Sequence, residues 1–278
     1  MARIKNDRFL IAEKFNSIQG EGKTTGYPSY FIRVQNCNLS CGCSPSYVNQ
    51  MKKGEIVHQA GDFVGDLHKE NKASWTCDSI PVWIHGKGTM FEDLILDWKE
   101  ENVYEDILKG IIHIIWTGGE PTMYQEAIVN FDKFWQLEEN KSGCGTSKVF
   151  HEIETNGTMY IEGPLFSLLN QINCSPKLSN SGMSKNARII PKAIQRIMEH
   201  PNYQFKFVIS NEDDIFEMFD TYINEFNIPL QNVCCMPALD DPEKFQERTH
   251  FIMEMAKKYK FIGLSRMHIA AWGRTCGV

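Results

Sequence analysis

The chain has 278 residues, 42% hydrophobic and 23% charged, a composition that predicts one large globular domain over residues 1–278. Its net charge of −6, from 29 basic and 35 acidic residues, provides no electrostatic footprint for a nucleic-acid backbone and favours a small-molecule substrate. No apolar run approaches the roughly 18 residues that span a membrane, and the polar N-terminus does not resemble a signal peptide, so we expect a cytoplasmic protein without a membrane partner.

Short runs rich in β-branched and aromatic residues alternate along the chain with amphipathic stretches of helical period. The strand candidates are residues 30–34, 111–116, 149–153, 171–174, 203–209, 233–236 and 267–270. The helix candidates are residues 90–102, 125–138, 163–169, 191–199, 213–226 and 241–258. This alternation indicates βαβ units, a parallel sheet and therefore an α/β fold.

A polar stretch with weak periodicity, residues 42–76, interrupts the alternation. We interpret it as an insertion in the loop after the first strand, because loops of this length are uncommon in compact domains. Three later strand candidates end in suggestive residues, namely Thr117 to Glu120, Glu154 to Gly157, and Ser175 to Lys177. Functional sites of parallel sheets gather at the carboxyl ends of strands, so these endings predict one shared site.

Cys37, Cys41 and Cys43 lie within seven residues, in a chain with nine cysteines. In a cytoplasmic protein, such a group indicates metal or redox chemistry rather than disulfides. Three thiolates suit a 4Fe–4S cluster with one iron left open to a chelating molecule. A structural zinc site with a distant fourth ligand is the alternative, although the three-residue gap is not that of a zinc knuckle. The adjacent Cys234 and Cys235 lie in an apolar strand and are interpreted as buried structural residues.

Further motifs follow in a fixed order along the chain. They are QGEG at 19–22, CNLSC at 37–41, WTCDS at 75–79, WTGGEP at 116–121, ETNGT at 154–158, SPK at 175–177 and LSRMHIAAWG at 264–273. Together they resemble the 7-carboxy-7-deazaguanine synthase family of radical S-adenosylmethionine (SAM) enzymes, from about residue 11 to 273 apart from the insertion. The resemblance implies a partial (β/α) barrel of the radical SAM type.

The family's cluster motif is compact, CNLxCxxC followed by Asp-Thr, and this chain departs from it. Cys41 is followed by Gly42-Cys43 and then Ser-Pro, whereas the expected ending appears downstream at Cys77, Asp78 and Ser79. The resemblance therefore implies that the insertion separates the second ligand from the third. The implied cluster ligands are Cys37, Cys41 and Cys77, and a local set that uses Cys43 in place of Cys77 is the alternative.

The resemblance also implies that the open iron chelates SAM, and that no side chain acts as a catalytic group because the cluster and SAM generate the radical. The methionine end of SAM would meet Gly118, Gly119 and Glu120, with the Glu120 carboxylate accepting from the ammonium group. The ribose would be held by Glu154 and Ser175, with Lys177 as a weaker candidate.

The implied substrate is 6-carboxy-5,6,7,8-tetrahydropterin. Arg33 would pair with its carboxylate, and His268 would be a further contact with this group. The remaining substrate contacts implied by the resemblance are Gln19, Gly20, Glu21 and Thr117. Ser79 stands where the family has a threonine that binds Mg²⁺, and it keeps the oxygen ligand that this cation requires.

The implied activity is that of a carbon–nitrogen lyase in 7-deazaguanine and queuosine-type biosynthesis. Hydrogen abstraction at C6 of the pterin, radical ring contraction and loss of ammonia would give 7-carboxy-7-deazaguanine. The family further suggests a homodimer and an electron donor such as flavodoxin or ferredoxin. The alternatives are another radical SAM enzyme, such as a glycyl-radical activase, and a non-catalytic zinc-binding interaction protein.

Overall fold

A single sheet organises the computed structural model, which describes residues 7–57, 67–142, 148–238, 242–273 and 277. The strand order is β3-β1-β2-β4-β5-β6-β7-β8-β9. The strands are β1 (Arg8–Ile18), β2 (Pro28–Val34), β3 (Lys87–Met90), β4 (His113–Gly118), β5 (His151–Thr155), β6 (Gln171–Cys174), β7 (Tyr203–Ile209), β8 (Val233–Pro237) and β9 (Ile262–Gly263). From β2 through β9 neighbouring strands are parallel, whereas β1 pairs antiparallel with β2 and β3.

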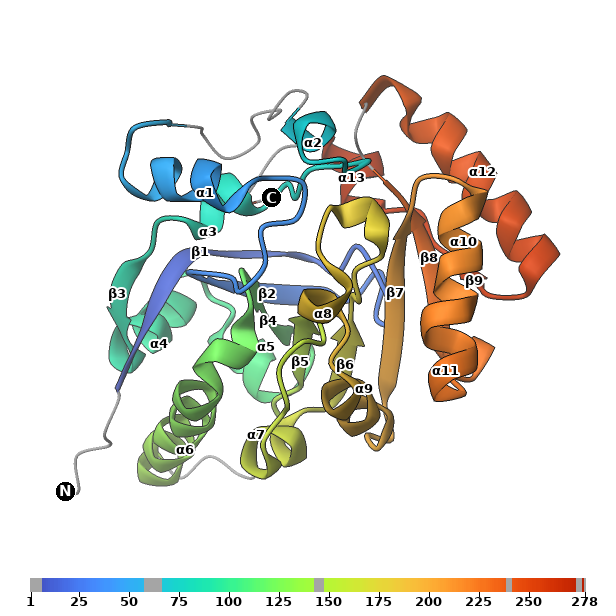
Figure 1. Ribbon diagram of the computed structural model, residues 1–278. Coiled ribbons are helices and arrows are strands. Elements are labelled where there is room, and N and C mark those ends of the chain that lie inside the picture. Colours follow the sequence, from blue (N-terminus) through green and yellow to red (C-terminus); the bar gives the residue numbers. More distant parts are fainter. Residues whose placement is uncertain (1–6, 58–66, 143–147, 239–241, 274–276, 278) are drawn as a thin grey trace.

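Helices follow most of the strands and cover one face of the sheet (Figure 1). They are α1 (Pro45–Lys52), α2 (Leu67–Glu70), α3 (Ile80–Trp83), α4 (Phe91–Glu100), α5 (Tyr104–Leu108), α6 (Gln125–Ser142), α7 (Gly163–Leu168), α8 (Lys185–Arg188), α9 (Pro191–Met198), α10 (Glu212–Met218), α11 (Asn224–Phe226), α12 (Phe245–Tyr259) and α13 (Met267–Trp272). The order of β and α elements and the open sheet confirm the predicted α/β fold, a partial (β/α) barrel. None of the described helices is long and apolar enough to cross a membrane.

The main core lies between the sheet and the helices that cover it, on what we call the outer face. In α4, Phe91, Leu94, Ile95 and Trp98 recur at the spacing of one helix face and are buried there. In β7, Phe205 and Phe207 join the same core, while Gln204 and Lys206 alternate with them. Successive side chains of a strand point to opposite faces, so these polar residues occupy the inner face.

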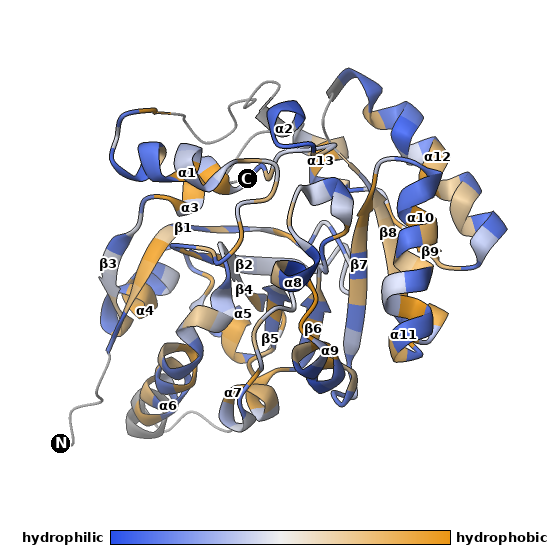
Figure 2. Cartoon of the chain, viewed as in Figure 1, coloured by the Kyte–Doolittle hydropathy of each residue, from blue (hydrophilic) through white to orange (hydrophobic). Residues whose placement is uncertain are grey.

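The inner face carries buried polar side chains on several neighbouring strands. It includes Glu152 and Glu154 of β5, Asn173 of β6 and Lys206 of β7. In Figure 2, β7 carries both hydrophilic and hydrophobic residues. The connection between β1 and β2 crosses this face, because the Thr24 hydroxyl donates to both carboxylate oxygens of Glu152, at 2.9 and 2.8 Å. Over β5, β6 and β7 the inner face is thus occupied by hydrogen-bonded polar groups.

Two sequence predictions about the elements are wrong. The segment expected as a strand at residues 267–270 is helix α13. The insertion follows the second strand of the sheet, because β1 precedes it; the mixed polar and apolar residues of β1 hid that strand from the sequence analysis. The insertion contains α1 and α2, two short helices that were not among the helix candidates. Residues 58–66 of the insertion lie outside the described part of the chain.

Candidate active site

A pocket opens at the carboxyl ends of the parallel strands. Its lining comes from the segment after β2, the end of the insertion with α3, and the residues at and just beyond the ends of β4, β5, β6, β7 and β8. Glu21 of the β1–β2 connection and Arg266 before α13 complete it. The predicted site residues that line it are Glu21, Cys37, Cys41, Cys77, Ser79, Thr117, Gly118, Gly119, Glu154, Ser175 and Lys177. The three strand endings singled out in the sequence therefore do meet at one pocket.

Cys37, Cys41 and Cys77 line this pocket, whereas Cys43 does not. The Cys43 side chain is 1% exposed and packs with Val48 of α1 and Trp83 of α3 in a small apolar cluster. Burial raises the pKa of both Cys37 and Cys41 to about 12, so their thiols need a metal to become thiolates at neutral pH. Cys77 packs against the edge of this cluster and also lines the pocket, whereas Cys43 lies within the cluster and does not line the pocket.

The two ends of the insertion are held together beside these cysteines. The Cys77 N–H donates to the Cys41 carbonyl at 3.1 Å. Gly42 has a φ of +76°, and a Cβ at this position would lie 2.2 Å from the carbonyl oxygen of Trp75. The chain can therefore close at this point only with glycine after Cys41. The contact brings Cys77 next to Cys41 although 77 − 41 − 1 = 35 residues lie between them.

The geometry of the three thiols bears on which metal group they suit. Among the described residues, no three His, Cys, Asp or Glu side chains converge as the ligands of one ion do. A zinc ion needs all of its ligands within about 2.3 Å of one point. In a 4Fe–4S cluster, by contrast, each thiolate binds a different iron, so the ligands can stand around an open pocket. Three thiols that line one open pocket fit the ligand set of such a cluster.

Gly118 and Gly119 allow the end of β4 to approach another segment of the protein backbone closely. A Cβ on Gly119 would lie 1.7 Å from the Asn36 carbonyl oxygen, and one on Gly118 would lie 2.3 Å from the Val34 nitrogen. Both glycines thus let the end of β4 pack directly against the segment that leads to Cys37. Both glycines also line the pocket, and their small size determines where the segment with Cys37 lies beside it.

Glu120 lies behind the pocket and does not line it. Its side chain is fully buried, and its Oε1 accepts from the Thr122 hydroxyl at 2.6 Å and the Thr155 hydroxyl at 2.7 Å. Its Oε2 accepts from the Asn156 N–H at 2.7 Å. Burial raises the pKa of this carboxyl, and the hydrogen bonds oppose the rise. In this structure Glu120 joins the ends of β4 and β5.

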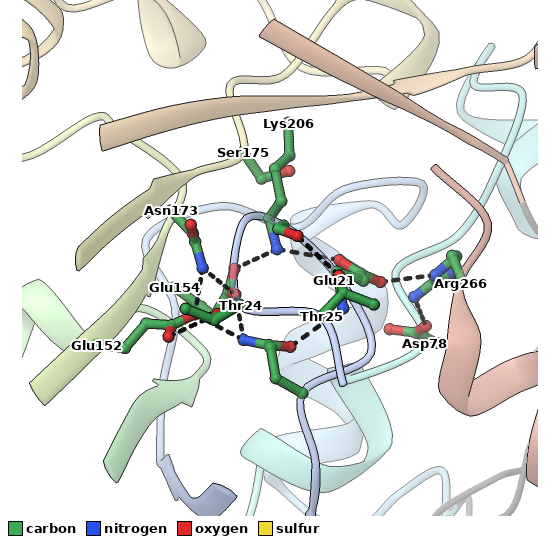
Figure 3. A network of polar contacts seen from close by, with 12 residues as sticks. Glu21, Thr24, Thr25, Asp78, Glu152, Glu154, Asn173, Ser175, Lys206 and Arg266 are labelled. Carbon is green, nitrogen blue, oxygen red and sulfur yellow. Dashed lines mark hydrogen bonds and ion pairs between the residues drawn. The ribbon is translucent and has the colours of Figure 1, made fainter. Parts of the chain in front are cut away.

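An ionic network crosses the pocket wall (Figure 3). Lys206 Nζ lies 2.6 Å from Glu154 Oε2 and 3.1 Å from Glu21 Oε2. Arg266 contacts Glu21 Oε1 through Nε at 2.8 Å and Asp78 Oδ2 through Nη2 at 2.9 Å. Lys206 and Arg266 together hold the pKa of Glu21 well below its usual range, despite burial. Glu21 is therefore an ionised carboxylate, fixed between two cations.

Gln19 belongs to the inner face beneath this network. Its Nε2 donates to Glu152 Oε1 at 2.8 Å and to Glu154 Oε1 at 3.1 Å. Asn173 also donates to both carboxylates, as Figure 3 shows. The Gln19 side chain is 3% exposed and does not line the pocket, so in this structure its contacts are to the protein. Its hydrogen bonds hold the Glu152 and Glu154 carboxylates in place.

Arg33 and Ser79 contact each other at one side of the site. Arg33 Nη1 donates to Ser79 Oγ at 3.1 Å, and its Nε donates to Glu13 Oε2 at 3.1 Å. Arg33 pairs in register with Thr117 and so shares the inner face, but only Thr117 lines the pocket. Ser79 Oγ donates to Asp78 Oδ1 at 3.1 Å, which places a carboxylate beside the hydroxyl.

The C-terminal helix α13 docks onto the QGEG segment. The Met267 N–H donates to the Gly20 carbonyl at 3.0 Å, and a Cβ on Gly20 would lie 2.1 Å from His268 Nδ1. His268 is therefore next to Gly20, as a shared role requires, although neither residue lines the pocket. Burial and the nearby Arg266 lower the pKa of the imidazole.

Lys206, Arg266, Asp78 and Asn173 are site residues that the sequence reasoning did not assign. A signal for two of them exists: charged or amide residues alternate with apolar ones in QINC and YQFKFVI. Parallel strands buried on both faces normally read as continuous apolar runs. Such alternation in an interior strand therefore indicates a polar inner face.

No protein-family model matches the chain. It is similar to curated proteins named 7-carboxy-7-deazaguanine synthase, from Pyrobaculum aerophilum (27% identical, covering 97% of each chain) and Halobacterium salinarum (25% identical, 94% of this chain and 90% of the relative). A crystal structure of QueE from Escherichia coli shares the fold, with a TM-score of 0.53, 20% identity and 92% of each chain covered. The resemblance that the sequence motifs indicated is confirmed over almost the whole chain.

Proposed function

We propose that this chain, a relative of the 7-carboxy-7-deazaguanine synthases, is a radical SAM lyase that converts 6-carboxy-5,6,7,8-tetrahydropterin to 7-carboxy-7-deazaguanine. One observation carries the proposal beyond the similarity: three thiols and two network carboxylates, Glu21 and Glu154, line the same pocket. When bound, the cluster and SAM supply the radical chemistry, which is the cofactors' own. The chain's residues bind, orient and exclude water.

The 4Fe–4S cluster is proposed to bind Cys37, Cys41 and Cys77. The support is that these thiols line the pocket while Cys43 is enclosed in an apolar cluster. SAM is proposed to occupy the pocket next to the cluster, with its methionine end at Gly118 and Gly119.

The Glu120 contact to the SAM ammonium group stays a prediction, because this carboxylate is buried behind the wall. The ribose is proposed to bind Glu154, Ser175 and Lys177. Ser175 Oγ accepts from Lys177 Nζ at 2.9 Å, so these two side chains act as one polar group.

The pterin ring is proposed to bind Glu21, with Thr117 beside it and with Gln19, Gly20 and His268 shaping that end of the site. Because Glu21 is ionised, it can only accept hydrogen bonds, and it would select the N–H edge of a heterocycle. The substrate carboxylate is proposed to pair with Arg33, which would have to turn away from Glu13.

Mg²⁺ is proposed to bind Ser79 Oγ together with the substrate. The neighbouring Asp78 carboxylate supports this choice, because hard cations prefer oxygen ligands. We also propose that the protein acts in the cytoplasm as a homodimer and receives electrons from a flavodoxin or ferredoxin.

Turnover after anaerobic reconstitution tests the function. The reconstituted chain, with SAM, Mg²⁺ and a reductant, should convert the carboxy-tetrahydropterin to the deazaguanine acid, detected by mass spectrometry. An intact cluster that cleaves SAM but yields no product would overturn the substrate and leave another radical SAM activity. Failure to take up iron under conditions where the chain binds zinc would favour the zinc-binding alternative.

A further inference from the structure

Lys206 is a buried cation beside the pocket to which the proposed function gives no role. It lies on the inner face of β7, and its side chain is 2% exposed. Burying an ammonium group is costly unless charged partners surround it. Its two partners are Glu154, at 2.6 Å, and Glu21, at 3.1 Å. Lys206 does not line the pocket, but both of its partners do.

The two partners come from separate parts of the fold. Glu154 belongs to β5, and Glu21 lies in the connection between β1 and β2. In the proposed function they serve different ligands, since Glu154 holds the SAM ribose and Glu21 holds the pterin ring. A radical reaction between two bound molecules depends on their relative placement, and misplacement by about 1 Å can cost about a hundredfold in rate. One ammonium group that contacts both carboxylates fixes the distance between them.

We propose that Lys206 is a positioning residue that joins the SAM-binding carboxylate Glu154 to the substrate-binding carboxylate Glu21 and thereby sets the two ligands relative to each other. The inference rests on the proposed function for the role of Glu21. For Glu154 it requires only that the chain binds SAM. Lys206 itself touches neither ligand and acts through the two carboxylates.

The charges around Glu154 give this role a signature in pH. Lys206 faces Glu154 from β7, Glu21 from the β1–β2 connection and Glu152 from its own strand, and the Cys234 thiol lies on the same face of β8. Cys174 of β6 belongs to the core on the outer face. Burial raises the pKa of Glu154 to about 7, and Lys206 opposes the rise. Loss of the ammonium group would raise the pKa further, so Glu154 would be protonated at neutral pH and would ionise again at higher pH.

A double-mutant cycle on the reconstituted enzyme tests the proposal. The probe is S-adenosylhomocysteine, whose binding is measured by calorimetry and does not depend on turnover. At about pH 7, Lys206→Met should weaken its binding about tenfold, and the loss should shrink by about pH 9 as Glu154 ionises. In a Glu154→Gln background the same substitution should change the affinity less than about twofold, because Lys206 then has no ribose-binding carboxylate to act on.

Lys23→Met is the matched control. Lys23 also links the β1–β2 connection to β7, but it donates to the Tyr203 carbonyl at 3.0 Å and to Asn232 Oδ1 at 3.2 Å, not to a carboxylate. It should leave the affinity unchanged at both pH values. An equal loss in Lys23→Met, or a loss in Lys206→Met that is the same at both pH values and persists in the Glu154→Gln background, would overturn the proposal.

Two further measurements keep the test decisive. Where Lys206→Met does not fold, Lys206→Arg keeps the charge and should retain the affinity within about threefold, whereas Lys206→Gln should show the pH-dependent loss. For Glu21, Lys206→Met should raise the KM for the pterin in the wild-type background but not in Glu21→Gln. Wild-type enzyme that binds S-adenosylhomocysteine without turning over the pterin would refute the proposed function, and the S-adenosylhomocysteine cycle would still test Lys206.

Discussion

The two faces of the same strands have opposite chemistry. On the outer face Ile153, Phe205 and Phe207 are buried against the helices, while on the inner face Glu154 and Lys206 alternate with them along the same backbone. Fully burying a Phe side chain stabilises a fold by about 1.5–3 kcal/mol. A buried ion pair contributes little net stability once both charges are desolvated. The outer face therefore accounts for folding, and the inner face is explained by what it holds in place.

The largest expected effect contrasts a pocket-facing thiol with a packed one. Cys77→Ala should abolish cluster loading, whereas Cys43→Ala should retain roughly four irons per chain. Iron and acid-labile sulfide analysis after anaerobic reconstitution measures the difference. Loss of iron only in Cys43→Ala would show that the packed thiol is the ligand and would reverse the assignment.

A cavity in the core on the outer face should lower the free energy of unfolding without changing the affinity for ligands. Phe205 is fully buried in the main core, so Phe205→Ala should reduce the free energy of unfolding by about 3–5 kcal/mol. Urea denaturation measures this loss, with the exposed Lys23→Met as the control. If Phe205→Ala instead changed the affinity for SAM and left the free energy of unfolding unchanged, the outer face could not be assigned to stability and the inner face to ligand binding.

The free energy of unfolding should depend on pH in opposite ways through Glu21 and Glu154. The folded pKa of Glu21 lies below the reference value of 4.5, so its stabilisation is present above about pH 4.5 and is lost as pH falls. The folded pKa of Glu154 is raised to about 7, so stability should decrease as pH rises from 4.5 to 7. Each effect should be on the order of 1 kcal/mol.

Urea unfolding between about pH 3 and pH 8 separates these two contributions. Glu21→Gln should flatten the acid limb of the stability curve, and Glu154→Gln should flatten its decline toward neutral pH. Curves that stay parallel to the wild-type curve in both variants would show that the two carboxylates do not titrate as their surroundings indicate.

The smallest effect is expected for an ion pair at the surface. Lys258 Nζ lies 2.6 Å from Glu212 Oε1, as close as the Lys206 pair, but the Lys258 side chain is 55% exposed. Lys258→Gln should leave the free energy of unfolding unchanged within the error of the measurement, because water screens exposed pairs. A thermal melt measures it, and a loss as large as that of Phe205→Ala would contradict the contrast between buried and exposed charge.

Much of the sheet could be predicted because its central strands are short apolar runs of clear type. The candidates 171–174 and 203–209 coincide with β6 and β7. Strands β3 and β9 are edge strands of four and two residues, too short to leave a pattern. The apolar run at 267–270 is helical because α13 docks through Met267 onto Gly20, a contact that local propensity does not encode.

The site could be predicted where strand endings carry recognisable residues, and not where it depends on distant contacts. Arg266 and Glu21 are 266 − 21 = 245 positions apart, and only the fold brings them to 2.8 Å. Glu120 and Gln19 show the opposite case, since their motifs were recognised but their side chains are engaged by the protein. A motif identifies the residues, while burial and partners decide which of them remain free to bind.

The hydrogen bond between Cys77 and Cys41 has a consequence for the entropy of the metal site. Closing a loop of 35 residues instead of the two in a compact motif costs about 2.5 kcal/mol more in chain entropy. Here Gly42, Trp75 and Asn180 already close the loop, because Trp75 Nε1 donates to Asn180 Oδ1 at 3.1 Å and the Gly42 N–H donates to the Ser181 carbonyl at 2.9 Å. Folding of the protein thus compensates for the entropy of the long connection, and an arriving cluster finds all three thiols already at one pocket.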